Sequence, residues 1–124
     1  MKFVLFVAEI FMKINYDKRV FKSMQNSETG EVSGETRFYY HQKGNVVWAE
    51  YYGGEIIFGN LIAKVFDDDS LEMSYQHLNM QGELMTGKCL SKPEIIASGK
   101  IRLFEQWQWT CKDFARGESI IEEI

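Results

Sequence analysis

The chain has few of the residues that usually mark a cross-linked fold or a metal site. Its 124 residues include one proline, two cysteines and two histidines. Cys89 and Cys111 cannot by themselves build a disulfide framework or a zinc site, so we expect reduced thiols in a cytoplasmic protein. His41 and His77 stand alone, without the spacing of metal ligands. We therefore predict no metal site.

Long apolar runs and an excess of basic residues are also missing. No run reaches the roughly 18 apolar residues of a membrane span, so we predict no membrane partner. Lys and Arg number 14 against 18 Asp and Glu, a net charge of −4, which disfavours a nucleic-acid partner. Residues 1–12 (MKFVLFVAEIFM) form a short apolar segment that Glu9 interrupts. We interpret them as an N-terminal extension or an extra strand rather than a secretion signal.

The common catalytic and cofactor motifs are absent. There is no Gly-x-x-x-x-Gly-Lys-Ser/Thr phosphate loop, no Gly-x-Gly-x-x-Gly fingerprint and no Gly-x-Ser-x-Gly nucleophile turn. The acidic run 67–69 lacks the glycine and the distal glutamate of a calcium loop. We predict no cofactor and assign no catalytic residue, which favours a protein that is not an enzyme.

The residues that are abundant favour β-structure. Hydrophobic residues make up 45% of the chain and aromatic residues 15%, with ten glycines. This length and composition predict a single domain, residues 1–124, with a real core. Aromatic and β-branched runs separated by glycine-bearing turns are typical of strands and hairpins.

Eight segments have strand character and follow one another with short turns. They are 19–26, 36–42, 46–52, 55–66, 71–80, 84–90, 100–110 and 118–124. We expect a bend or bulge at Gly59-Asn60 and a longer loop over 91–99, which holds Pro93. Serial hairpins predict an all-β, antiparallel up-and-down meander. Because a closed sheet has no exposed edges, we predict that it closes into a β-barrel. A β-sandwich is the main alternative.

The strand over 100–110 carries the strongest hint of a binding site. Alternation places Ile101, Leu103, Glu105, Trp107 and Trp109 on one face. A carboxylate in the middle of an apolar, aromatic face is unusual for a purely structural strand. If Glu105 is buried, it requires a nearby cation or a raised pKa.

We therefore predict a cavity inside the barrel that binds a small molecule. Its candidate lining is Glu105, Trp107, Tyr75 and His77, with Arg37 as the counter-charge. The competing interpretation places Glu105 at a rim, paired with a surface lysine or arginine.

Several segments resemble a family of small bacterial proteins, mainly from Firmicutes and their relatives, over nearly the whole chain. They are 26–32 (NSETGEV), 82–87 (GELMTG), 99–103 (GKIRL), 105–109 (EQWQW) and 117–124 (GESIIEEI). Members of that family are often labelled N-acetylglutamate synthase. That label is disfavoured, because an acetyltransferase needs an acetyl-CoA loop that opens a helix, and the chain has neither. By strand count the fold is similar to the calycin group of lipocalins and fatty-acid-binding proteins, which is an analogy of fold alone.

Three functions stay open at this point. The first is a non-catalytic barrel that binds a small molecule. The second is an enzyme on the same barrel, with Glu105 or His77 as acid or base. The third is a protein-interaction module with Tyr39, Tyr51 or Trp48 as exposed anchors, or a homodimer through the amino-terminal strand.

Overall fold

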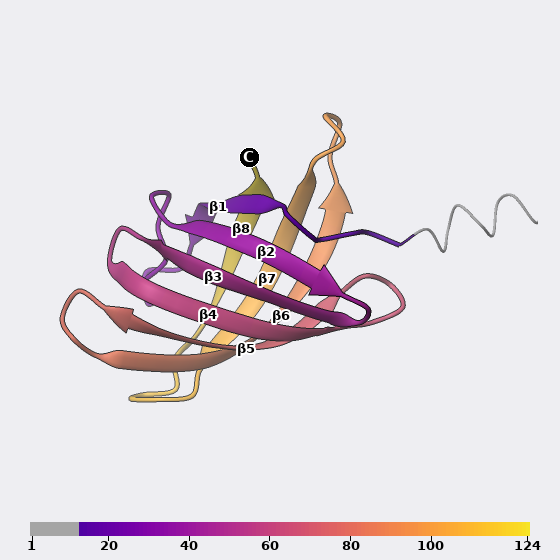
Figure 1. Ribbon diagram of the computed structural model, residues 1–124. Helices are drawn as coiled ribbons and strands as arrows, with labels where there is room; N and C mark the ends of the chain where they lie inside the picture. The colour runs from indigo at the N-terminus through magenta and orange to yellow at the C-terminus, as the bar shows by residue number, and fades with distance from the viewer. Residues whose placement is uncertain (1–12) are drawn as a thin grey trace, which may run out of the picture.

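The computed structural model describes residues 13–124, which form eight antiparallel strands (Figure 1). The strands are β1 (Val20–Asn26), β2 (Arg37–Lys43), β3 (Val46–Gly53), β4 (Ile56–Val65), β5 (Leu71–Asn79), β6 (Leu84–Ile95), β7 (Ile101–Trp109) and β8 (Arg116–Glu123). Each strand pairs with the next along the chain, and the sheet closes into a barrel. The predicted meander and its closure are confirmed, and the sandwich alternative is wrong.

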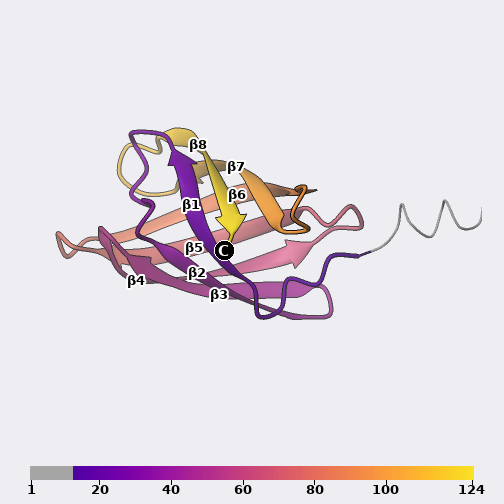
Figure 2. The same cartoon turned by 90° about the horizontal axis from the view of Figure 1, so that it is seen from above.

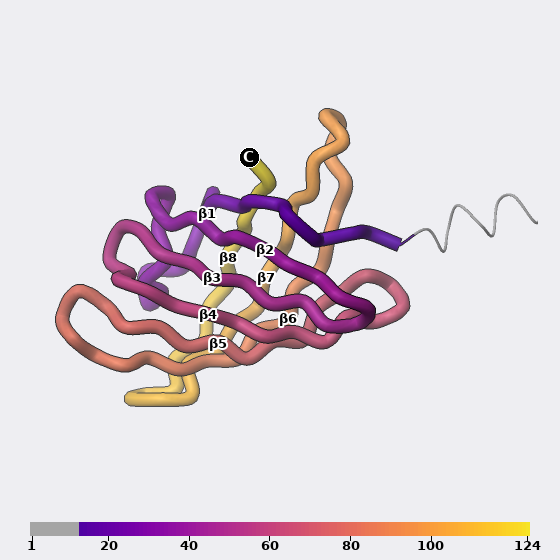
Figure 3. Tube along the Cα trace, viewed as in Figure 1, coloured from indigo at the N-terminus to yellow at the C-terminus, as the bar shows by residue number. Residues whose placement is uncertain are grey.

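Closure occurs where β8 returns to β1 (Figures 2 and 3). Phe21 is opposite Glu123, and Asn26 is opposite Ser119, with a register shift between Ser23 and Gln25. The guanidinium group of Arg19 donates to the Glu123 carboxylate at 3.0 Å beside this seam. The predicted extension or extra strand of residues 1–12 lies outside the described residues. No helix among residues 13–124 is long and apolar enough to cross a membrane.

Strand alternation places the core inside the barrel. On β7 the predicted inner face holds, because Ile101, Leu103, Trp107 and Trp109 are buried whereas Phe104 between them is exposed. The same period of two on β2 and β3 turns alternate side chains inward. Among the described residues, Tyr40 Oη is the one buried side-chain polar atom that has no hydrogen-bond partner.

Glycines opposite aromatic side chains shape the inner wall. Three cross-strand pairs have this form: Tyr51 with Gly59, Tyr75 with Gly87, and Trp107 with Gly117. In each pair a Cβ on the glycine would collide with the aromatic ring. Gly59 is therefore a site of close packing. The bulge that we predicted at Gly59-Asn60 is wrong, since the register shift lies between Ile56 and Phe58.

The loop predicted over 91–99 is also wrong at its start, because β6 continues to Ile95 and pairs with β7 throughout. Proline is tolerated there because the pairing of β6 with β5 ends at Ser91. The Ile96 amide donates to the Lys100 carbonyl and so points toward β7. Because successive backbone nitrogens of a strand point to opposite sides, the Pro93 nitrogen, three residues earlier, points away from β7. The β6–β7 hairpin thus extends beyond the barrel (Figure 1).

Different segments close the two ends of the barrel. At one end Tyr16, which is fully buried, donates from its hydroxyl to the Asp69 carbonyl at 2.5 Å. The Tyr16 amide donates to the Gln42 side chain at 2.7 Å. At the other end the β1–β2 loop, residues 27–36, contacts strands on the far side of the sheet. The candidate site lies below this loop.

Candidate functional site

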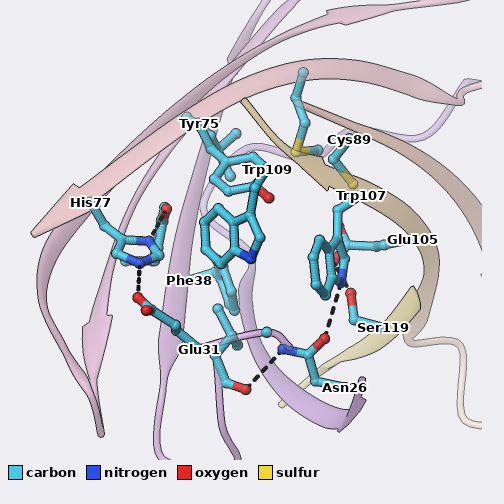
Figure 4. Close-up of a pocket in the computed structure, with 15 residues that line it drawn as sticks. Asn26, Glu31, Phe38, Tyr75, His77, Cys89, Glu105, Trp107, Trp109 and Ser119 are labelled. Carbon is cyan, nitrogen blue, oxygen red and sulfur yellow. Dashed lines mark hydrogen bonds and ion pairs between the residues drawn. The ribbon is translucent and has the colours of Figure 1, made fainter. Parts of the chain in front are cut away.

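A cavity of about 60 Å³ lies inside the barrel beneath the β1–β2 loop (Figure 4). Its lining comes from all eight strands and from the loop: Asn26, Gly30, Glu31, Val32, Phe38, Tyr51, Leu61, Met73, Tyr75, His77, Cys89, Glu105, Trp107, Trp109 and Ser119. Its volume is more than the roughly 10–15 Å³ that a single water molecule needs, so the cavity is large enough for a small group. This is the predicted internal cavity.

Glu105 is a half-buried acid that faces the cavity. Its carboxylate accepts hydrogen bonds from the Ser91 hydroxyl on β6 at 3.2 Å and from the Ser119 hydroxyl on β8 at 3.1 Å. Burial raises the pKa of Glu105 from 4.5 to about 7, and the two serine hydroxyls partly oppose that rise. The sequence predicted either a nearby cation or a raised pKa, and the raised pKa is the outcome.

Among residues 13–124, no cationic side chain contributes to the pKa of Glu105. Its titratable neighbours are Tyr40, Tyr51, Tyr75 and Cys89, in all of which burial raises the pKa and keeps the group neutral. Arg37 does not line the cavity, because its guanidinium group donates to the carbonyls of Gly34 and Thr36. The prediction of Arg37 as the counter-charge is therefore wrong: Arg37 and Phe38 alternate on β2, and Phe38 is the inward one.

Aromatic rings form one wall of the cavity. The Trp107 and Trp109 ring centroids lie 5.6 Å apart with their planes inclined at 58°. Tyr75 meets Trp109 edge to face, with 5.9 Å between centroids. Glu105, Trp107, Tyr75 and His77 thus meet in one cavity, although ligand binding by them stays a prediction.

His77 links the barrel wall to the loop. Its Nε2 lies 2.8 Å from the Glu31 carboxylate, and its Nδ1 lies 2.9 Å from the Tyr51 hydroxyl. Desolvation lowers the pKa of His77 despite the opposing effect of Glu31, so the ring is neutral near pH 7. Because Nε2 is beside a carboxylate, it carries the proton and donates to Glu31, and Nδ1 accepts from Tyr51.

The indole nitrogens of Trp107 and Trp109 also anchor the β1–β2 loop. Trp107 Nε1 donates to the Asn26 side chain at 3.0 Å, and Trp109 Nε1 donates to the Thr29 carbonyl at 3.1 Å. The Asn26 amide in turn donates to the Val32 carbonyl at 3.1 Å (Figure 4). The sequence analysis did not assign Asn26 and Glu31 to the site. Their only signal was a polar loop of glutamates and glycines between two strands.

The fold and the cavity can now be set beside known proteins. A family described as "Avidin-like protein" matches residues 14–124, which is nearly all of the chain. The chain belongs to the avidin-like family. No curated protein and no solved structure matches it.

Membership of the avidin-like family agrees with the eight-strand calycin-type barrel. It gives no support to the label N-acetylglutamate synthase or to a bacterial origin. Among residues 13–124, no group of three or more His, Cys, Asp or Glu side chains is placed to hold a metal ion.

The outer face of this avidin-like barrel carries its own aromatic cluster on β2, β3 and β4. Tyr39 stacks on Tyr52 at 5.4 Å between centroids, and Tyr52 stacks on Phe58 at 6.4 Å. Trp48 is 38% exposed, whereas Tyr51 is 2% exposed. Tyr51 as an exposed anchor is therefore wrong, because it alternates with Tyr52 and points inward. An interaction surface through Tyr39 and Trp48 stays a prediction.

The loop contacts of this avidin-like barrel predict the effect of a change at Glu31. Replacing Glu31 with alanine leaves His77 Nε2 without its acceptor and removes one of the two carboxylate acceptors of Asn79 Nδ2, the other being Glu83. We expect a loss of about 1–2 kcal/mol in the free energy of unfolding, because hydrogen bonds to a charged group are lost at a part-buried site. We also expect at least tenfold faster hydrogen exchange at the amides of residues 27–34, measured by mass spectrometry.

Glu28 provides the matched control, since it is an exposed glutamate of the same loop. Glu28→Ala should leave both the stability and the exchange unchanged. Unchanged exchange in the Glu31→Ala variant would show that the hydrogen bonds of Glu31 do not hold the loop.

Proposed function

We propose that this protein binds a small molecule in the cavity beneath the β1–β2 loop and does not transform it chemically. The observation that carries the proposal is a half-buried acid beside an aromatic wall. Glu105 faces the cavity without a cationic partner among residues 13–124, and Trp107, Trp109 and Tyr75 form the wall. Binding sites in barrels have this composition, with a few converging polar groups among apolar walls.

Two further observations support binding rather than catalysis. Avidin-like barrels bind small molecules such as biotin and are generally not enzymes. Within the cavity, Glu105 bonds to Ser91 and Ser119, whereas His77 bonds to Tyr51 and Glu31. The two candidate acid–base groups thus belong to separate hydrogen-bond clusters.

Thermal unfolding in the presence of a metabolite panel tests the proposal. A ligand that binds the folded state and is present at 100 times its Kd stabilises it by about 2.7 kcal/mol, or roughly 10 °C in Tm for a domain of this size. Trp107→Phe should at least halve the shift, because Trp107 lines the cavity.

Trp48→Phe is the control, since Trp48 lies on the outer face. It should leave the Tm shift intact. A panel in which no compound raises Tm would contradict the proposal. A shift that is lost with Trp48→Phe and kept with Trp107→Phe would move the binding site to the outside of the barrel.

A further inference from the structure

Every lining group of the cavity that can carry charge near neutral pH is acidic. Two glutamates, Glu31 and Glu105, line it, and among the described residues no lysine or arginine does. The one histidine, His77, is neutral for the reason given above. An anionic ligand would meet an uncompensated carboxylate without a single positive partner, so the walls disfavour carboxylates and phosphates.

The two acids differ in what they still offer. Glu31 is already engaged by His77 and by Asn79, whose amide donates at 3.1 Å. Glu105 accepts two serine hydroxyls, although a carboxylate has about four acceptor positions. Glu105 therefore keeps free acceptor capacity, and no cation of the described part of the chain pairs with it.

The aromatic wall complements a positive charge as well. The faces of indole and phenol rings carry negative potential, and a cation held over them in a dry site gains about 2 kcal/mol or more. Trp107, Trp109 and Tyr75 adjoin the same space as Glu105, and the Trp109 centroid lies 5.6 Å from that of Trp107 and 5.9 Å from that of Tyr75. The rings and the acid thus form a cage open to one small group.

The size of the cavity limits that group. A cavity of about 60 Å³ suits a compact ligand head rather than a large one, unless the loop opens. A compact alkylammonium group fits this space better than an extended chain or a fused ring system.

We propose that the ligand of this cavity is a small organic cation, an alkylated ammonium compound held between Glu105 and the rings of Trp107, Trp109 and Tyr75. The inference rests on the proposed function and names its ligand class. It also assigns Glu105 the role of setting the preference for charge. The aromatic rings supply shape and cation–π attraction.

Three compounds of one shape and different charge test the proposal. Choline is the cation, 3,3-dimethylbutan-1-ol is its neutral isostere, and 3,3-dimethylbutanoate is a related anion. At pH 8, isothermal titration and indole fluorescence should show choline binding at least tenfold more tightly than the alcohol. The anion should not bind. Equal affinity for choline and the alcohol would overturn the proposal.

Two variants isolate the charge of Glu105. Glu105→Gln keeps the side-chain shape and should weaken choline binding at least tenfold, while binding of the neutral alcohol stays within twofold. Glu94→Gln removes the same charge from an exposed position on the β6–β7 hairpin and should change neither affinity. Retained choline affinity in Glu105→Gln would overturn the assignment.

The outcomes also separate this inference from the proposed function. If choline does not bind while another compound of the panel gives a Tm shift that depends on Trp107, the proposed ligand class is wrong and the proposed function stands. If neither choline nor any panel compound binds, both are wrong.

Discussion

Glu105→Gln is expected to stabilise the protein by about 2 kcal/mol at pH 8 and by much less at pH 5. Burial raises the pKa of Glu105 from 4.5 to about 7 in the folded chain. Between these values the folded state binds more protons than the unfolded state, so stability falls as the pH rises from about 4.5 to 7 and then levels off. Glutamine has no charge to bury. The full pKa difference corresponds to about 3 kcal/mol, which we reduce because Glu105 faces a cavity that water can enter.

Urea unfolding at several pH values between 5 and 8 measures this effect as the difference between the two proteins. Glu94→Gln is the control and should follow the unchanged protein at every pH, because Glu94 is exposed. Parallel stability curves for Glu105→Gln and the unchanged protein would show that the carboxylate is well solvated in the folded state. The expected gain also implies that the present residue is retained at a cost to stability, as binding groups often are.

Gly59→Ala should destabilise the barrel by about 3 kcal/mol, although it adds one methyl group. The added Cβ would lie 2.7 Å from the Cβ of His77 and would also meet the Tyr51 ring. A ring can rotate, but the His77 Cβ is fixed to the backbone of β5, so the two strands would have to separate locally. The hydrogen bond between Tyr51 and His77 would be lost with them.

Gly34→Ala is the matched control for this substitution. An added Cβ at Gly34 would meet nothing closer than the Ser23 carbonyl oxygen at 3.8 Å. Its effect should stay within about 0.5 kcal/mol. Chemical denaturation of both variants decides the comparison. Equal stabilities would mean that β4 and β5 adjust to the extra atom, and that the tight glycine is not needed to seat the aromatic wall.

The barrel could be predicted from the sequence because two local signals agree along the chain. Turn residues separate the strands, and the period of two assigns each side chain to a face. On β7 this was sufficient to place Glu105 among inward aromatic residues. The same rule, applied to Val47, Ala49 and Tyr51 on β3, predicts that Tyr51 is buried, and its proposal as an exposed anchor overlooked that rule.

The rest of the site depends on contacts between residues distant in sequence, which alternation does not specify. Ser91 and Ser119 reach Glu105 only because β6 and β8 flank β7 in the closed sheet. Glu31 reaches His77 across 46 residues through an irregular loop. Arg37 lies on the face of β2 opposite the inward Phe38 and Tyr40, so its charge does not reach Glu105, and alternation alone does not say which of the two faces of β2 is the inner one.

The projecting β6–β7 hairpin has a consequence for how the protein behaves at high concentration. Beyond Ser91, no strand of the described residues pairs with β6 on the side away from β7, and free edges recruit strands from other molecules. Pro93 turns its nitrogen toward that edge and offers no amide hydrogen there, and the exposed Lys92 and Glu94 beside it carry charge. A strand from another molecule that added to this edge would lack a backbone hydrogen bond at Pro93. The hairpin therefore carries its own protection against intermolecular sheet growth.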